Sequence, residues 1–170
     1  PYSIASLAQA DEFLEFHLGC RRSGAFIDQA RQFKVGDVVQ VGEVRGGALH
    51  YDPEWQSRPL WLFAAGTGLA PVWGVLREAL RQGHHGPIRV LHMADEHYLD
   101  EPLRSLAQAH PNLLVEQFPA GEPPPLRLSS RQTIALVCGS PISVEEFSRR
   151  LFLAGLPRSQ LYSDVFVGRG

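Results

Sequence analysis

The sequence lacks the cysteine patterns that crosslink small domains through disulfides or bind structural metals. Its two cysteines, Cys20 and Cys138, lie far apart and have no CxxC spacing. A disulfide framework needs paired cysteines and a structural zinc site needs clustered ones, so we expect neither. Unpaired cysteines are typical of a reducing compartment, and we therefore predict a cytoplasmic location.

The sequence also has no excess of charge of one sign and no long hydrophobic run. Its 170 residues have a formal net charge of −2, which gives no electrostatic reason to expect nucleic acid or an anionic membrane surface as a partner. No apolar stretch approaches the length of a membrane span, and no signal peptide is visible. The first residue is not Met, so we expect the natural amino terminus to lie upstream of Pro1.

Residues 1–55 have the pattern of antiparallel β-structure. Segments 1–6, 13–21 and 37–44 are strand-like, and the third is rich in β-branched residues. A short helix is possible between the second and the third. Three such strands are too few to bury both faces of a sheet or to close a barrel by themselves. We therefore predict an incomplete antiparallel sheet that ends in a polar linker punctuated by prolines.

From Leu60 onward, apolar strands alternate with amphipathic helices. Strand patterns cover 59–66, 88–94, 113–118, 133–139 and 160–167, and helix patterns cover 70–83, 100–110 and 143–155. We expect Asp100 to cap the second helix, and Ser143 with Glu146 to form a capping box on the third. This alternation predicts a second domain over 56–170, an α/β fold with a doubly wound parallel sheet. Ligands of such sheets bind at the carboxyl ends of the strands.

The first strand of this domain ends in a glycine-containing turn, FAAGTGLAP. Gly66 and Gly68 would let the backbone turn tightly and approach a ligand, and the amino terminus of the following helix attracts phosphate. Pro71 stands where a full GxGxxG motif has its third glycine. The turn therefore fits a dinucleotide site and, equally, a plain tight connection between a strand and a helix.

The fourth strand ends in LVCGSP, which places Cys138 before a loop into a helix. A lone cysteine there is usually a small buried hydrophobic residue. Val144 occupies the position where a cysteine phosphatase loop has arginine, and no GxSxG elbow is present, so we expect no nucleophilic catalysis. The histidines lack metal-ligand spacing, and we expect no metal site. Solvated or site-lining positions are expected for His84, His85, His92 and His97.

Together these motifs resemble those of the flavin-dependent reductases of the ferredoxin–NADP reductase type, which include reductase components of bacterial oxygenases. PYS is similar to the family's Arg-x-Tyr-Ser flavin motif, with the arginine falling just before Pro1. GTGLAP resembles the loop that binds the nicotinamide-dinucleotide pyrophosphate, and CGSP resembles the family's Cys-Gly-x-Pro. The resemblance implies that 1–55 is part of a flavin-binding β-barrel without its first half, and that 56–170 binds NAD(P).

The resemblance also implies which residues would bind FAD and NAD(P)H. On the flavin side it implicates Tyr2, Ser3, His17, Leu18, Gly24, Ala25 and Phe26, with Tyr2 stacked on the flavin and Ser3 near its N5 atom. On the dinucleotide side it implicates Gly66, Thr67, Gly68, Cys138, Gly139, Ser140 and Pro141. In the terminal strand, Asp164 stands where Glu is usual and Phe166 occupies the aromatic position. The implied catalytic residues are Ser3, Cys138 and Asp164.

The implied reaction is hydride transfer from the nicotinamide C4 to the flavin N5, in which the cofactors supply the chemistry and the protein holds the rings in contact. Cys138 would pack and orient rather than react. Electrons would then pass to an iron–sulfur or oxygenase partner, since the chain has no cysteine cluster of its own. Two alternatives stay open: a nucleotide-binding module that has lost flavin, and a subunit that docks on a partner and passes electrons without its own substrate.

Four positions bear on which cofactors bind. Ile27 stands where the family usually has Ser or Thr, which removes a hydroxyl from the flavin pyrophosphate site, and Glu43 replaces the proline of a Gly-Pro-x-Gly turn. Because half of the flavin barrel is absent, we expect this chain alone to hold FAD poorly. Asp95 and Glu96 follow the second strand, where NADP-using relatives tend to carry arginine. Carboxylates there would repel a 2′-phosphate and could accept hydrogen bonds from a free ribose hydroxyl, which predicts a preference for NADH. The alternative is that both acids only begin a solvated loop.

Overall fold

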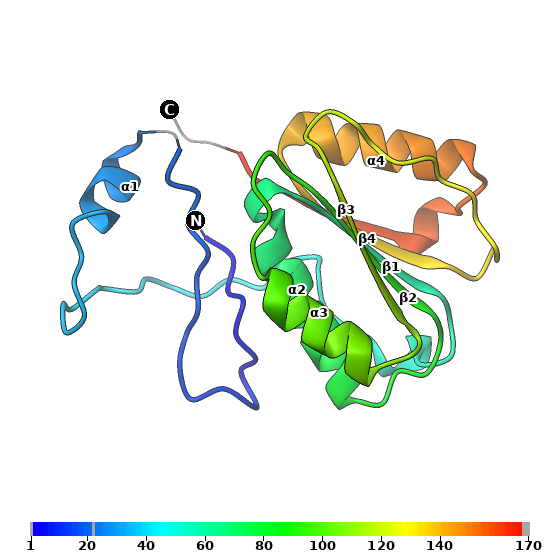
Figure 1. The fold of residues 1–170 in the computed structure, drawn as a ribbon, viewed down its shortest axis with the longest axis horizontal. Coiled ribbons are helices and arrows are strands. Elements are labelled where there is room, and N and C mark those ends of the chain that lie inside the picture. The colour runs from blue at the N-terminus through cyan, green and yellow to red at the C-terminus, as the bar shows by residue number, and fades with distance from the viewer. Residues whose placement is uncertain (1, 22, 168–170) are drawn as a thin grey trace.

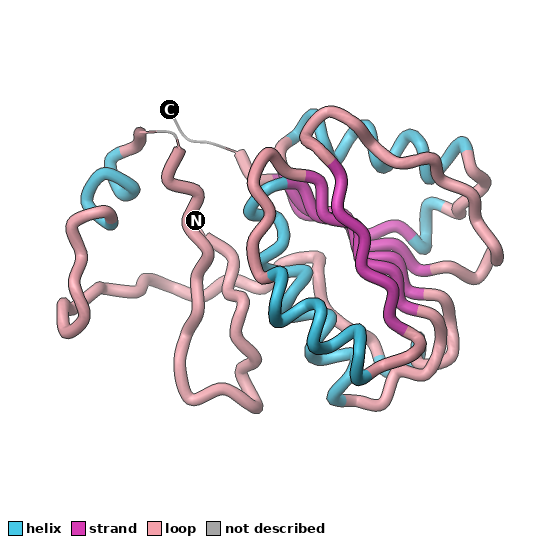
Figure 2. The backbone as a smooth tube through the Cα atoms, viewed as in Figure 1, coloured by secondary structure: helices cyan, strands magenta, loops and turns pink. Residues whose placement is uncertain are grey.

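Five parallel strands form the centre of the computed structural model, which describes residues 2–21 and 23–167 (Figures 1 and 2). The strands are β1 (Leu60–Ala65), β2 (Ile88–Met93), β3 (Leu113–Phe118), β4 (Ile134–Gly139) and β5 (Leu161–Val165). They lie in the order β3-β2-β1-β4-β5, and each pairing is parallel. The predicted α/β fold with a doubly wound parallel sheet is therefore confirmed.

Helices cover both faces of this sheet (Figure 1). α2 (Leu69–Arg81) and α3 (Asp100–Ala109) pack on one face, and α4 (Pro141–Leu153) packs on the other. Short 3₁₀ helices span Pro53–Trp55, Gly66–Gly68 and Arg158–Gln160. Over the described residues, no helix is long and apolar enough to cross a membrane.

The central strand β1 shows why an uninterrupted apolar run predicts a buried strand. Leu62 and Ala64 belong to the core beneath α2 and α3, whereas Trp61 and Phe63 belong to the core beneath α4. Successive side chains of a strand point to opposite faces, so a strand covered on both sides is apolar at every position. Phe63 contacts Phe147 of α4 with ring centroids 5.0 Å apart, which helps to fix that helix over the sheet.

Two of the predicted helix starts are wrong, and the structure shows what replaces them. α4 begins at Pro141, and Ser140 caps it by accepting a hydrogen bond from the backbone N–H of Ser143 at 3.3 Å. Proline suits the first helical turn because its missing N–H needs no partner there. Glu146 pairs with arginines of the same helix instead of closing a capping box. Asp100 is the first residue of α3 and not its cap, and its Oδ1 accepts a hydrogen bond from a β3 glutamine at 2.6 Å.

The described residues before Leu60 form less sheet than the sequence predicts. They contain the expected short helix, α1 (Ala25–Ala30), and one antiparallel bridge between Ile4 and Phe16. The strand predicted over 37–44 is not formed, and Figure 2 shows this stretch as loop. A strand needs a neighbour for its backbone groups, and within the described part of the chain this stretch has none. Within the described residues, the bridge between Ile4 and Phe16 is therefore the part of the predicted antiparallel sheet that forms.

The amino-terminal segment packs on α2 through residues 4–16. Ala5 is fully buried in the core, and a Cβ added at Gly74 would lie 3.3 Å from its carbonyl oxygen. Arg77 of α2 donates to both carboxylate oxygens of Asp11, at 2.7 and 2.8 Å. These hydrogen bonds lower the pKa of the Asp11 carboxyl to about 2. A bidentate ion pair therefore joins the segment to the sheet domain.

We predict that Asp11→Asn loosens residues 4–16 from α2 and leaves the sheet intact, because the amide loses the charge-assisted pair with Arg77. Limited digestion with pepsin measures this as faster cleavage within the segment. In the unaltered chain, cleavage should rise as pH falls from 3.8 to about 2. The folded-state pKa of Asp11 lies below its unfolded value, so the contribution of the pair is present at higher pH and is lost on protonation.

The control variant is Asp28→Asn, which removes an exposed pair with Arg31 on α1 and should leave cleavage within 4–16 unchanged. Equal acceleration of cleavage in the sheet and in the segment would contradict a local role for the Asp11–Arg77 pair.

Candidate functional site

The connections that follow β1 and β4 meet at the carboxyl edge of the sheet. These strands are neighbours, and the strand order reverses between them, since β2 and β3 lie on one side and β5 on the other. A Cβ added at Gly68, in the turn after β1, would lie 2.4 Å from the carbonyl oxygen of Cys138 in β4. Glycine permits this approach because it has no side chain. The two sequence motifs are therefore in direct contact, in the crevice where open α/β sheets bind ligands.

Two further glycines shape this crevice. Gly66 has a φ of +56°, which L side chains rarely adopt, and the space where its Cβ would sit is open. Gly139 has a φ of +152°, and an added Cβ would lie 2.7 Å from the Cβ of Ala65. The turn around Gly66 thus leaves backbone accessible just before α2, where backbone N–H groups and the helix dipole attract anions. This arrangement fits a pyrophosphate group.

A buried histidine supports the turn after β1. His92, in β2, is fully buried, and its Nε2 donates a hydrogen bond to the Gly66 carbonyl at 3.0 Å. Burial lowers the pKa of His92, so the ring is neutral and its Nδ1 accepts from Nδ1 of His97, 3.3 Å away. His84 is also buried, with 5% of its surface exposed. The prediction of a solvated position is therefore wrong for His84 and His92. His92 does lie at the border of the site, through its contact with Gly66.

Cys138 approaches Gly68 through its backbone carbonyl, and its side chain has no exposure to solvent. Burial raises the pKa of this thiol to about 12, and the carboxylate of Asp164 acts in the same direction. Asp164 stands opposite Cys138 in the pairing of β4 with β5. The backbone N–H of Phe166 donates to the Gly139 carbonyl at 2.8 Å, which brings the terminal strand to the same edge. A neutral, buried thiol can pack against a ligand but is not a nucleophile.

The amino-terminal segment reaches this edge through His17. The Nε2 of His17 donates to Glu15 Oε1 at 2.8 Å, and its Nδ1 lies 3.0 Å from the hydroxyl of Tyr98, in the loop after β2. In the tautomer with its hydrogen on Nε2, the His17 ring can accept at Nδ1 from the Tyr98 hydroxyl. Burial raises the pKa of Tyr98, with nearby Cys138 adding to the effect, so this hydroxyl stays protonated. Tyr98 stands in no sequence motif, and its role was not predicted.

The run His17–Gly19 lies close to the turn after β1. A Cβ added at Gly19 would lie 3.3 Å from Cγ2 of Thr67. Leu18 is half-buried between them. The structure thus brings this predicted flavin-side run to the predicted dinucleotide loop, although the two are far apart in the sequence.

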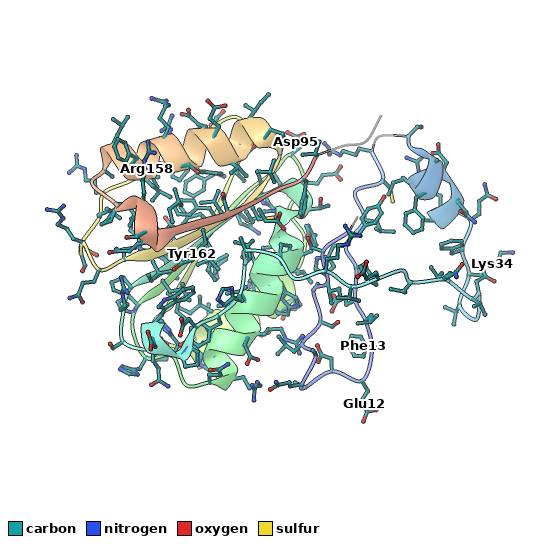
Figure 3. The ribbon with its side chains drawn as sticks, turned by 180° about the vertical axis from the view of Figure 1, so that it is seen from behind. Glu12, Phe13, Lys34, Asp95, Arg158 and Tyr162 are labelled. Carbon is teal, nitrogen blue, oxygen red and sulfur yellow. The ribbon has the colours of Figure 1, made fainter. Side chains whose placement is uncertain are left out.

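The remaining predicted flavin-side residues lie around α1. The ring of Tyr2 packs on Phe26, with centroids 5.1 Å apart, and Phe26 packs on Phe33. Gly24 precedes α1 and Ala25 begins it. Figure 1 shows α1 standing apart from the sheet, and Lys34 lies at that far end in Figure 3. The structure therefore does not bring α1 to the crevice.

The structure also shows where the remaining residues of the sequence predictions lie. Ile27 is buried, which accounts for an apolar side chain at this position of α1. Ser3 is half-buried beside the residues that pack on α2. At the carboxyl edge of the sheet, Ser140 and Pro141 begin α4 directly after the Cys138 turn.

Asp95 lies after β2 at the same edge (Figure 3), and its partner comes from the amino-terminal segment. Arg21 Nη1 donates to Asp95 Oδ2 at 3.0 Å, and Arg21 Nη2 donates to Glu96 Oε1 at 2.5 Å. Sequence analysis missed this cation because the three residues share no motif and lie far apart along the chain.

Comparison with known proteins agrees with this geometry. The family model described as oxidoreductase NAD-binding domain matches residues 62–125. The ferredoxin–NAD(P)+ reductase component of the naphthalene 1,2-dioxygenase/salicylate 5-hydroxylase systems of Ralstonia sp is 29% identical over 188 residues, which cover 100% of this chain and 56% of the relative. The chain is similar to ferredoxin–NADP reductase-type oxidoreductases along its length.

Two other proteins define how far this similarity extends. The ferredoxin–NAD(P)+ reductase component of the Pseudomonas putida naphthalene 1,2-dioxygenase system is 28% identical over 195 residues, with 100% of this chain and 56% of the relative covered. The crystal structure of the Amycolatopsis cytochrome P450 reductase GcoB superposes with a TM-score of 0.75 at 23% identity, over 97% of this chain and 55% of that one. The latter shows the shared fold. This chain thus spans about half the length of these relatives.

We predict that Gly68→Ala destabilises the fold by about 1–3 kcal/mol, the usual cost of overpacking a tight contact. Its neighbour is the Cys138 backbone, which cannot swing aside as a flexible side chain can. Gly66→Ala is the matched control, because its Cβ meets open space and only left-handed strain of about 1–2 kcal/mol is expected. Urea unfolding followed by circular dichroism gives both values. A larger loss for Gly66→Ala would contradict the close contact as the reason for glycine at position 68.

We predict that one thiol per native chain reacts with Ellman's reagent at pH 8, and that this thiol is Cys20. Cys20 is exposed, whereas Cys138 is buried with its pKa raised to about 12 and stays protonated at pH 8. Both cysteines should react in guanidinium chloride, and Cys20→Ser should abolish the native reaction. Fast native labelling of Cys138 would contradict the buried, neutral thiol.

Proposed function

We propose that this chain is the nucleotide-binding part of an NAD(P)H-dependent flavin oxidoreductase, which receives a hydride on FAD and passes electrons to an iron–sulfur or oxygenase partner. The contact between Gly68 and the Cys138 carbonyl carries this proposal, because it joins a phosphate-binding turn to the cysteine beside which the nicotinamide would lie. The Ralstonia and P. putida relatives are named as ferredoxin–NAD(P)+ reductase components, which supports the same direction of electron flow.

In this proposal the chain divides at the polar linker into a partial flavin domain over 1–55 and a dinucleotide domain over 56–170. The match of residues 62–125 to the NAD-binding family model supports the second assignment. The different character of the first part supports the division, since it contributes no strand to the parallel sheet. The run His17–Gly19 would be the place where the two parts face each other.

The dinucleotide would bind along the carboxyl edge of the sheet. Gly66, Thr67 and Gly68 would hold the pyrophosphate before the amino terminus of α2, because backbone N–H groups and the helix dipole favour a dianion there. Gly139, Ser140 and Pro141 would let the nicotinamide approach Cys138 closely, since none of them adds a bulky side chain. Asp95 would accept a hydrogen bond from a ribose hydroxyl, which favours NADH.

The residues around Cys138 would orient the transfer and exclude water from it. A bound FAD supplies the chemistry, by taking up a hydride at its ring. Cys138, which is buried in the core, would support the wall of the nicotinamide site as an uncharged packing group, in keeping with its raised pKa. Asp164 on β5 and Phe166 just after β5 reach the same edge. They would close the site from the other side. Tyr2 and Ser3 would contact the flavin.

A second candidate is a nucleotide-binding module that has lost flavin. Two observations favour it: the described residues before Leu60 contain one antiparallel bridge, and the side chain of Ile27 in α1 is apolar and buried. A protein of this kind would bind the dinucleotide but would not bind the flavin that accepts the hydride. The two candidates therefore differ in flavin binding and not in nucleotide binding.

The test is anaerobic mixing of the purified full-length protein, loaded with FAD, with NADH, followed by flavin absorbance. We expect rapid bleaching, and reoxidation on adding a ferredoxin. Cys138→Ala should slow bleaching by about tenfold to a hundredfold, because a nicotinamide displaced by a fraction of an ångström transfers hydride poorly. Cys20→Ala is the control and should bleach at the normal rate. NADH binding without retention of flavin would favour the second candidate, and absence of NADH binding would overturn both.

A further inference from the structure

We propose that Tyr98 is a positioning residue, which holds the run His17–Gly19 at a fixed distance from the turn after β1. The inference rests on the proposed function, because it assumes that this run belongs to the flavin side of the site and the turn to the dinucleotide side. Tyr98 lies in the loop after β2, outside the motifs that mark those two sides. It would act on hydride transfer through the position of His17.

The hydroxyl of Tyr98 fixes the imidazole of His17. The phenol oxygen lies 3.0 Å from Nδ1 of His17, and the two rings meet edge to face with centroids 5.2 Å apart. On the other side of the imidazole, Nε2 lies 2.8 Å from Glu15 Oε1. An ionised carboxylate can only accept, so Glu15 favours the tautomer with its hydrogen on Nε2, and that tautomer can accept at Nδ1 from Tyr98. Both ring nitrogens are then used, which sets the orientation of the ring.

The ring of Tyr98 also contacts the residue that supports the turn after β1. His92 meets this ring edge to face, with centroids 5.6 Å apart, and donates to the Gly66 carbonyl at 3.0 Å. Burial raises the pKa of the Tyr98 hydroxyl, so the donor keeps its proton. The side chain of Tyr98 therefore connects His17 with the support of the Gly66 carbonyl.

Other contacts of this region constrain the run less. Gly19 lies close to the turn after β1 but has no side chain with which to bind it. Arg21 pairs with Asp95, but its side chain is 56% exposed, and water and salt screen such pairs. The side chain of His17 is only 10% exposed. The hydrogen bond between His17 and Tyr98 is therefore better shielded from solvent than the pair that Arg21 makes.

Hydride transfer makes this spacing matter. The reacting atoms must lie within about 3–3.5 Å of each other, and a small displacement slows the transfer strongly. With the flavin on the run and the dinucleotide at the turn, the connection from His17 through Tyr98 to His92 sets how closely the two approach. Loss of the Tyr98 hydroxyl should slow transfer and leave dinucleotide affinity unchanged, because the turn keeps its hydrogen bond from His92.

The test is rapid mixing of the FAD-loaded full-length protein with increasing concentrations of NADH, which separates the dissociation constant of NADH from the limiting rate of flavin bleaching. For Tyr98→Phe we expect the limiting rate to fall about fivefold, the scale of one neutral hydrogen bond, with the dissociation constant unchanged.

Hydrogen exchange gives a second readout that does not depend on flavin chemistry. In Tyr98→Phe the amides of 17–19 should exchange faster, and those of β1 should exchange at the normal rate. His17→Ala removes the partner of the hydroxyl, so adding Tyr98→Phe to it should have little further effect on exchange or on bleaching.

The matched control is Tyr51→Phe, which removes another contact between a tyrosine and a histidine. The Tyr51 hydroxyl lies 3.0 Å from Nδ1 of His84, which precedes β2 and so lies at the amino edge of the sheet, away from the proposed site. This variant should leave the bleaching rate and the exchange of 17–19 unchanged.

Two kinds of failure can be told apart. Equal slowing by Tyr51→Phe and Tyr98→Phe would show a merely structural role, and no change of rate or exchange in Tyr98→Phe would show no role. Either result would overturn the inference, while bleaching of the unaltered protein would still support the proposed function. Failure of the unaltered protein to bind NADH or to bleach would overturn the proposed function, and with it the role of Tyr98 in hydride transfer.

Discussion

The approach of the Gly68 backbone to the carbonyl oxygen of Cys138 is the constraint on which the rest of the structure depends. β1 and β4 lie side by side, so the turns that leave them must share the space at their carboxyl ends. A distance of 2.4 Å from an added Cβ to that oxygen leaves no room for any side chain. Because the strand order reverses there, α2 and α4 leave toward opposite faces, which is the arrangement at which open α/β sheets bind ligands.

The amino-terminal segment depends on this domain for its position. Three polar contacts lead it along the domain surface: Asp11 with Arg77 on α2, then His17 with Tyr98, then Arg21 with Asp95. The first contact lies on α2, and the other two lie in the loop after β2, at the carboxyl edge of the sheet. The segment has little structure of its own, since one bridge and one short helix are its regular elements within the described residues. Its function would therefore come from where the sheet domain holds it.

Burial sets the charge state of the groups at this edge. The thiol of Cys138 and the hydroxyl of Tyr98 keep their protons because desolvation raises their pKa values, and His92 stays neutral because desolvation lowers its pKa. The charged groups, Arg21 with Asp95 and Glu96, lie instead at the exposed rim. The edge therefore combines a neutral interior with a charged rim.

The sequence by itself determined the α/β architecture and the two turns that meet. Apolar runs such as 60–65 can be satisfied only by burial on both faces, and Gly68 and Gly139 stand where a side chain would not fit. The sequence could not predict that His92 is buried or that the valines of 37–44 find no partner strand, because both depend on neighbours distant in the chain. Tertiary structure alone decided that Tyr98 meets His17 and that Arg21 meets Asp95, since long-range contacts between polar side chains leave no periodic trace in a sequence.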